Sequence, residues 1–100
     1  MKQLNLQKLQ SNLRKKFLKV GVKMIGPETI FFSKDTRIGR NVIIEPYVVI
    51  AQKVKIGDNV TIAAKSGVTK NIPDNSVVAG FPAKDINLWK KEVIRNSLKK

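Results

Sequence analysis

The sequence predicts a mainly β fold, a short parallel β-helix of about three coils with an α-helix at each end. Three observations carry this prediction: an apolar period of six residues in the middle of the chain, a near copy of one hexad, and amphipathic segments that flank the repeat. The 100 residues are 42% hydrophobic and 27% charged, which suits one folded domain rather than a disordered chain. The expected boundaries are 1–21 for an N-terminal helix, 22–83 for the repeat and 84–100 for a C-terminal helix.

Large apolar residues recur every six positions through the middle of the chain. They are Phe32, Ile38, Ile44, Ile50, Ile56, Ile62 and Val68. A second register, mostly β-branched, follows four residues later at Thr36, Val42, Val48, Val54, Val60, Ser66 and Ile72. Neither a helix, with 3.6 residues per turn, nor the two-residue alternation of a strand produces a period of six. The alternative is a β-sandwich whose spacing is coincidental.

One hexad occurs twice, eighteen residues apart, as IGRNV over 38–42 and IGDNV over 56–60. Asparagine tolerates positive φ better than most residues, so Asn41 and Asn59 suit sharp corners. Eighteen residues then form one coil of three short strands, which places Ile38 under Ile56 in a solenoid. The phase slips near Ile30, where the first coil is expected to be irregular.

Both ends of the chain are expected to be helical and basic. The predicted apolar face of the N-terminal helix consists of Leu6, Leu9, Leu13, Phe17 and Val20. Such a helix would cover the apolar side chains and strand edges that an open solenoid end exposes. Near the C-terminus, Asp85 can cap a second helix that carries Ile86, Trp89 and Val93 on one face.

Composition excludes several kinds of chemistry. The chain has no cysteine and no histidine, which removes thiolate sites and the usual proton carrier at neutral pH. No apolar run approaches the ~20 residues of a transmembrane segment and no signal-type core follows the first lysine, so a cytoplasmic protein is expected. The net charge of +13 divides into +7 for residues 1–23, +2 for 24–83 and +4 for 84–100.

Two stretches resemble hexapeptide-repeat acyltransferases. The stretch VKIGDNVTIAAKSGVTKNIPDNSVVAGFPA over 54–83, with the tail to residue 100, resembles the end of the bacterial UDP-3-O-(3-hydroxyacyl)glucosamine N-acyltransferase of lipid A biosynthesis. The stretch NLRKKFLKVGVKMIGPETIFFSKDTRIGRNVIIEPYVV over 12–49 resembles the start of the acetyltransferase domain in the bifunctional N-acetylglucosamine-1-phosphate uridylyltransferase and glucosamine-1-phosphate acetyltransferase.

The resemblance implies a left-handed coil, a homotrimer and an acyl-carrier-protein or coenzyme A thioester as donor, with no bound cofactor or metal. The matching donor-binding positions are Gly80 and Lys84, where a base after the Gly-x-Pro-Ala turn meets phosphates. The plainer interpretation is a tight turn at Gly80 with Lys84 merely exposed. The middle coils that carry the family's histidine base are missing, so no catalytic residue is assigned. The carboxylates Glu45, Asp58 and Asp74 are expected to be solvated or to form turns.

Three functions therefore stay open. The first is a truncated acyltransferase-like protein that is inactive alone. The second is a small N-acyltransferase that uses a base other than histidine on an amino sugar. The third is an interaction subunit that joins mixed trimers or binds acidic partners; nucleic acid is disfavoured because aromatics do not alternate with the basic residues. Outward apolar residues Ile43, Tyr47 and Val49 are expected at a trimer interface.

Overall fold

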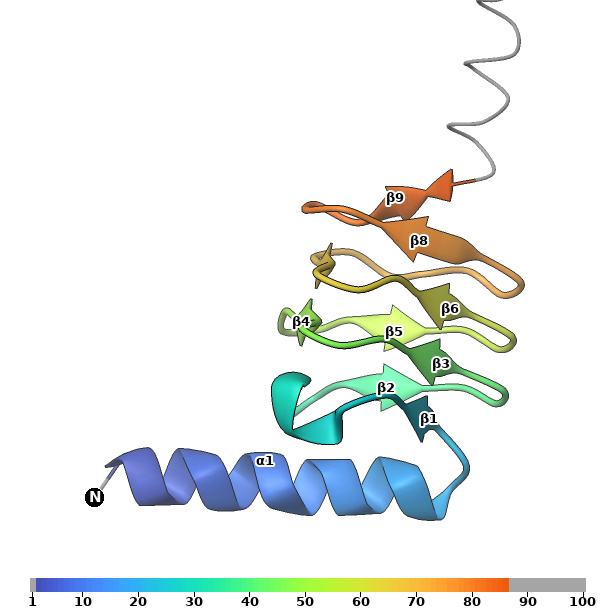
Figure 1. Cartoon of the computed structure of the whole chain (residues 1–100). Helices are drawn as coiled ribbons and strands as arrows, with labels where there is room; N and C mark the ends of the chain where they lie inside the picture. Colours follow the sequence, from blue (N-terminus) through green and yellow to red (C-terminus); the bar gives the residue numbers. More distant parts are fainter. Residues whose placement is uncertain (1, 87–100) are drawn as a thin grey trace, which may run out of the picture.

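The computed structural model describes residues 2–86 and shows stacked coils of very short strands above one helix (Figure 1). The elements are α1 (Lys2–Lys19), β1 (Lys23–Met24), the 3-10 turn η1 (Pro27–Thr29), β2 (Arg37–Ile38), β3 (Ile43–Ile44), β4 (Val49–Ile50), β5 (Lys55–Ile56), β6 (Thr61–Ile62), β7 (Gly67–Val68), β8 (Val77–Ala79) and β9 (Lys84–Asp85). The mainly β body and the N-terminal helix are therefore as the sequence predicts.

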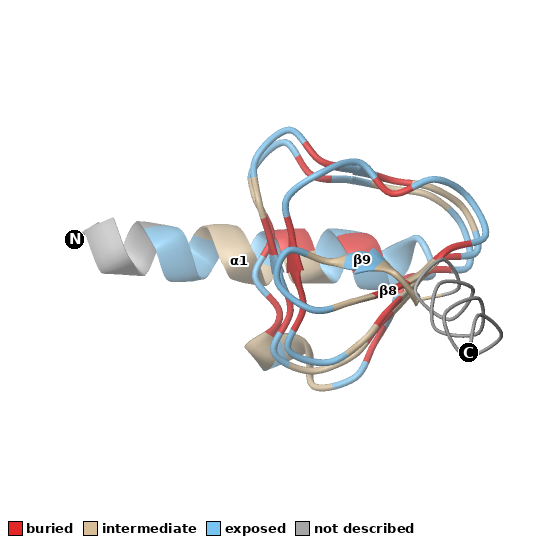
Figure 2. Cartoon of the chain, turned by 90° about the horizontal axis from the view of Figure 1, so that it is seen from above, coloured by how far each residue is buried: buried red, intermediate tan, exposed pale blue. Residues whose placement is uncertain are grey.

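The strands form three sheets that run along the stack. Their strand orders are β1-β3-β6-β8-β9, β2-β5 and β4-β7, and every pairing is parallel except that of β8 with β9. Seen from above, the coils superpose into a tube with three sides (Figure 2). Ile38 pairs with Ile56 in register, so the two copies of the hexad lie on adjacent coils as expected.

The two apolar registers fill the inside of the tube. Every member of both registers is buried except Ile38, which is half-buried. Burying one such aliphatic side chain contributes roughly 1.5–3 kcal/mol, so the repeat supplies most of the stabilising area. The buried hydroxyls are satisfied locally: Thr36 Oγ1 accepts the N–H of Ser33 and Ser66 Oγ donates to the Ala63 carbonyl.

The coils differ in length. The step between adjacent coils is eighteen residues where β3 pairs with β6, but twenty where Lys23 pairs with Ile43, because η1 adds two residues to the first coil. The last coil is two residues short, so Ile72 bridges Ile56, sixteen residues before it. The expectation that Ile72 continues the second register above Val54 is therefore wrong: Ile72 occupies the next position of the first register.

Helix α1 closes the N-terminal end of the tube. Leu13 and Phe17 are buried, and the Phe17 ring lies 4.8 Å from that of Phe32, centroid to centroid. The Gln10 amide donates to the Phe32 carbonyl and accepts the Phe32 N–H, at 2.7 and 2.9 Å, so it pairs with the open edge as a strand would. Leu6 and Val20 were expected on the buried face but are 59% and 66% exposed. Leu6 lies in the N-terminal part of α1, the end that extends beyond the tube, and Val20 lies in the turn that follows the helix (Figure 1).

The chain leaves the stack through a reversed strand. Ala79 pairs with Lys84 and Val78 with Asp85, so residues 84 and 85, expected to belong to the C-terminal segment, extend the five-stranded sheet. The helix expected after Asp85, with Trp89 and Val93, lies outside the described residues apart from Ile86.

Candidate functional site

The turn between β8 and β9, which begins at Gly80 and leads into Lys84, is hydrogen-bonded to strand β7. The Gly80 carbonyl accepts the N–H of Gly67 at 3.0 Å, and the Ala83 N–H donates to the Gly67 carbonyl at 2.8 Å. Gly80 has φ +93, a conformation that side chains with a Cβ rarely adopt. The sequence places Lys84 directly after the turn that begins at Gly80, and the structure shows how that turn is held.

An exposed aromatic ring lies beside this turn. Phe81 packs over Gly67 so closely that a Cβ at Gly67 would overlap the ring, yet the Phe81 side chain is 76% exposed on its other side. Lys84 is also exposed, on β9. Gly80, Phe81 and Lys84 thus present a polar backbone, an apolar ring and a cation on one short segment.

The ring belongs to a longer apolar surface on the β4-β7 side of the tube. We call Phe31, Val49 and Phe81 the apolar strip: Phe31 bridges Val49, Val49 pairs with Gly67, and Phe81 covers Gly67. Phe31 and Val49 are 46% and 51% exposed. The sequence analysis identified Val49 as outward-facing, and Tyr47 is exposed too, whereas Ile43 is half-buried. The eighteen-residue step from Phe31 to Val49 was a signal that could have revealed the strip.

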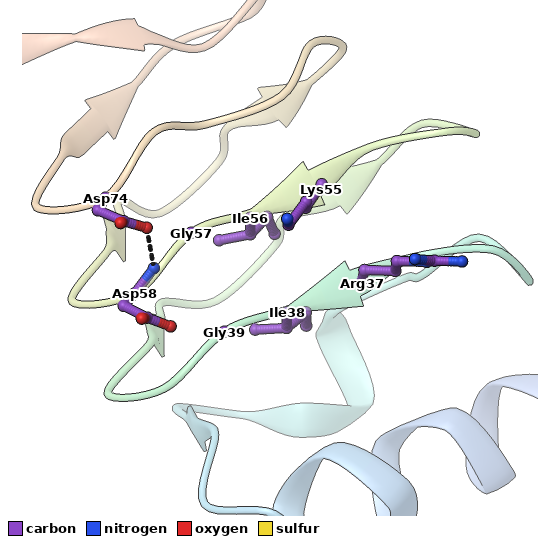
Figure 3. A pocket seen from close by; sticks show the side chains of 8 residues that line it. All are labelled: Arg37, Ile38, Gly39, Lys55, Ile56, Gly57, Asp58 and Asp74. Carbon is purple, nitrogen blue, oxygen red and sulfur yellow. Dashed lines mark hydrogen bonds between the residues drawn. The ribbon is translucent and has the colours of Figure 1, made fainter.

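The three carboxylates considered as alternative bases are engaged by the backbone. Asp58 Oδ1 accepts the N–H of Arg40 at 2.7 Å, and Asp74 Oδ1 accepts the N–H of Asp58 at 2.7 Å (Figure 3). Glu45 Oε1 accepts the N–H of Ala64 at 3.1 Å. Each carboxylate therefore ties one coil to the next, which agrees with a turn-forming role.

A shallow pocket of about 270 Å³ lies on the β2-β5 side of the tube (Figure 3). Arg37 and Lys55 line one end, and Asp58 and Asp74 line the other. Its floor includes Gly39 and Gly57, where the aspartates of the next coil fold over the backbone. The pocket could not be predicted from the sequence, because the six-residue period does not show on which side of the tube the basic residues of the repeat lie.

Parallel coils, a six-residue apolar period and corners at positive φ define a hexapeptide-repeat β-helix. Residues 35–70 match the family described as "Bacterial transferase hexapeptide (six repeats)". The chain therefore carries hexapeptide repeats over residues 35–70, and its similarities support a relationship to hexapeptide-repeat acyltransferases. It is 50% identical over 58 residues to bifunctional protein GlmU of Rhodopseudomonas palustris and 41% identical over 73 residues to that of Zymomonas mobilis.

Solved structures that resemble this chain are also hexapeptide-repeat or acetyltransferase proteins. The acetyltransferase domain of PglB from Neisseria gonorrhoeae, in complex with acetyl coenzyme A, is 33% identical with a TM-score of 0.60, over 64% of this chain and 30% of that one. A hexapeptide-repeat containing acetyltransferase from Vibrio cholerae, complexed with acetyl coenzyme A, is 26% identical with a TM-score of 0.52, over 65% of this chain and 52% of that one.

The chain spans a small share of its curated relatives. The two GlmU matches cover 58% and 72% of this chain, but only 13% and 16% of the relatives. Within residues 2–86, no helix is both long and apolar enough to cross a bilayer. The bifunctional relatives agree with the expected resemblance to a bifunctional enzyme, and the resemblance of residues 54–100 to the lipid A enzyme stays a prediction.

Proposed function

We propose that this chain is an amino-sugar acyltransferase relative that holds a thioester donor and does not transfer the acyl group by itself. One observation carries the second half of this proposal: the 100 residues contain no histidine. An amine held as ammonium cannot attack a thioester until a base removes its proton. The three carboxylates of the repeat that could replace the base accept backbone N–H groups instead.

Donor binding is supported by the segment around Gly80. A coenzyme A or acyl-carrier arm has an apolar, amide-bearing chain and ends in phosphates. The exposed Phe81 ring offers an apolar surface to such a chain, and Lys84 offers a cation to a phosphate. Complexes of two related structures with acetyl coenzyme A favour this class of donor.

The test of donor binding is calorimetric titration of the purified chain with coenzyme A. We expect Lys84→Gln to weaken binding several-fold, since it removes one charge-assisted contact. Lys8→Gln is the matched control, because Lys8 is also exposed and lies on α1, at the other end of the stack. Equal affinities for the wild type and Lys84→Gln would reject Lys84 as a donor contact.

We further propose a homotrimer in which the apolar strip and Tyr47 face a neighbouring subunit, in the left-handed form that the family implies. An uncovered row of such side chains is unusual on a small monomer. Sedimentation should show a trimer for the wild type and a smaller species for Val49→Asp. Gln52→Asp is the control, since Gln52 is exposed and lies off the strip. A wild-type monomer would remove the shared interface.

One observation supports the alternative that the chain is an interaction subunit: both ends of the chain are basic. It predicts that the chain co-purifies with a full-length hexapeptide-repeat relative as a mixed trimer. Co-expression of the two proteins, followed by sedimentation of the complex, separates this role from that of a homotrimer.

A further inference from the structure

The cations of helix α1 divide into two sets by what surrounds them. Two are engaged by other groups: Arg14 Nε donates to the Ile30 carbonyl at 3.0 Å, and Lys16 Nζ lies 5.5 Å from the centre of the Phe17 ring. Three further lysines of the helix are exposed and contact neither the tube nor an aromatic ring. We call these three residues the lysine row: Lys8, Lys15 and Lys19.

The lysine row lies on the side of α1 that faces away from the tube. An α-helix turns by about 100° per residue. Leu13 and Phe17 mark the buried side of the helix, and the three lysines lie about 180–220° around the axis from the middle of that side. The row spans roughly 16 Å of helix. Because α1 crosses the end of the stack, the row runs along the outer surface of this end (Figure 1).

No acidic residue lies near the lysine row in the sequence. The first acid is Glu28, and residues 1–23 carry a charge of +7. Within residues 2–86, none of the three lysines forms an ion pair or a side-chain hydrogen bond. The repeat differs, because its paired cations Arg37 and Lys55 share a pocket with two aspartates. The charge of the lysine row therefore faces solvent without a partner in the described part of the chain.

We propose that the lysine row docks this end of the protein on an anionic lipid surface. Each lysine held near such a surface strengthens binding about fivefold. Three ammonium groups on one side of a straight helix can reach a flat surface together. The apolar side chains of Leu18 and Val20 are exposed at the C-terminal end of the row. They can contact the region below the headgroups while the flexible lysine stems keep their ammonium groups among the headgroups.

An anionic lipid surface fits this face better than a nucleic acid does. Surfaces that bind nucleic acids combine cations with aromatic side chains on which bases stack. The single aromatic residue of α1, Phe17, is buried against Phe32, and the arginine of α1 is bonded to the Ile30 carbonyl. The exposed aliphatic side chain of Leu18 borders the row instead.

The inference goes beyond the proposed function and can fail independently of it. The proposed donor contact, Lys84, lies on β9, at the opposite end of the described stack from α1 (Figure 1). Lipid binding and donor binding can therefore be removed in different variants.

The test is co-sedimentation of the full chain with vesicles that contain equal amounts of phosphatidylglycerol and phosphatidylcholine. The wild type should bind these vesicles at low salt and should not bind vesicles of phosphatidylcholine alone. Moderate salt should weaken the binding, because it screens the attraction. The triple variant Lys8→Gln/Lys15→Gln/Lys19→Gln should weaken binding about tenfold or more. Circular dichroism of all variants confirms that they fold.

The matched control is Lys34→Gln/Lys53→Gln/Lys70→Gln, which removes the same charge from exposed positions of the repeat. It should bind the anionic vesicles nearly as the wild type does.

A fourth variant, Leu18→Asn, separates a lipid surface from other polyanions. It should weaken vesicle binding several-fold, because an apolar contact is lost without any change in charge.

Any of three results would overturn the proposal. They are no binding of the wild type to anionic vesicles at low salt, equal losses in the two triple variants, or tighter binding to polyuridylate than to vesicles at the same concentration of phosphate. The second result would show that charge acts without a defined surface. The third would assign the row to a nucleic acid.

Discussion

Two corners of the same tube use similar backbones in opposite ways. Asn41, Asn59 and Asn75 each have φ near +60 at one corner, and Asn59 forms side-chain hydrogen bonds to both of the others at 3.1 and 3.0 Å. Lys53 has the same φ at another corner, which we call the basic corner because the exposed residues Lys34, Lys53 and Lys70 lie along it. At the asparagine corner, side-chain amides form hydrogen bonds that hold adjacent coils together. At the basic corner the lysine side chains form no such hydrogen bonds within residues 2–86 and stay exposed.

Both corners depend on the interior that they share, so the largest effect is expected there. Ile56→Asp places an unpaired charge in a fully buried position, at a cost of several kcal/mol, against a total stability of about 5–15 kcal/mol for a typical domain. We expect loss of the cooperative thermal transition. Thr69→Asp, at an exposed position, is the control and should melt like the wild type. An Ile56→Asp variant with an unchanged Tm would place Ile56 outside the core.

The next prediction concerns Gly57, which lies against Asp74 of the next coil, beside the asparagine corner. We expect an added methyl group at Gly57 to destabilise the fold. A Cβ at Gly57 would lie 2.7 Å from the Asp74 backbone nitrogen and overlap the Asp74 carboxylate. Gly57→Ala should therefore destabilise the protein by about 1–3 kcal/mol in urea unfolding. Gly80→Ala is an informative comparison, since a Cβ there would make only an ordinary contact with the Pro82 carbonyl oxygen at 3.7 Å and the positive φ alone opposes the change. A neutral Gly57→Ala would mean that the coils are not held at this spacing.

Glycine substitutions separate the two corners directly. Glycine relieves the left-handed strain at either position, which is worth roughly 1 kcal/mol. At Asn59 the gain is outweighed by two lost hydrogen bonds, each worth roughly 0.5–1.5 kcal/mol. We expect Lys53→Gly to stabilise the fold slightly and Asn59→Gly to destabilise it, as measured by urea titration. Changes of the same sign at both corners would remove the distinction between them.

The smallest expected effect concerns salt. Added salt screens the repulsion between Arg37 and Lys55, since the Debye length is about 10 Å at 0.1 M. The Tm of the wild type should rise by about 1–2 °C between low and moderate ionic strength, as a few tenths of a kcal/mol would give for a chain of this size. Arg37→Gln/Lys55→Gln should show a smaller rise than Lys8→Gln/Lys15→Gln. Identical salt dependence in these variants would locate the repulsion elsewhere.

The sequence predicts the coil well because the period has one physical cause. Each side of a coil needs one large apolar residue that points inward. Ile44, Ile50 and Ile56 therefore reveal the repeat from the sequence alone. The asparagine corners follow from a conformational preference, but Tyr47, Lys53 and Lys65 adopt positive φ without such a preference. Their conformation is imposed by the coils and cannot be predicted from residue type.

Changes in coil length are harder to predict. The residues 72–76, IPDNS, repeat the hexad of 56–60 one coil later, but at a spacing of sixteen residues. A strict six-residue count therefore misplaces Ile72, although the Asp-Asn pair at 74 and 75 marks the third copy. For the same reason, Asp74 joins Asp58 at one end of the pocket only after the shortened last coil is placed.

The most direct test of the proposed function is product formation from coenzyme A and acyl-carrier thioesters with a glucosamine nucleotide, measured beside donor binding. The account predicts donor binding and no product above the uncatalysed reaction. General-base assistance alone contributes about 10²- to 10⁴-fold, and the chain contains no histidine to provide it. Turnover well above background that is abolished by Asp58→Asn, Asp74→Asn or Glu45→Gln, in variants that still fold, would contradict the account and identify an active N-acyltransferase with a carboxylate base.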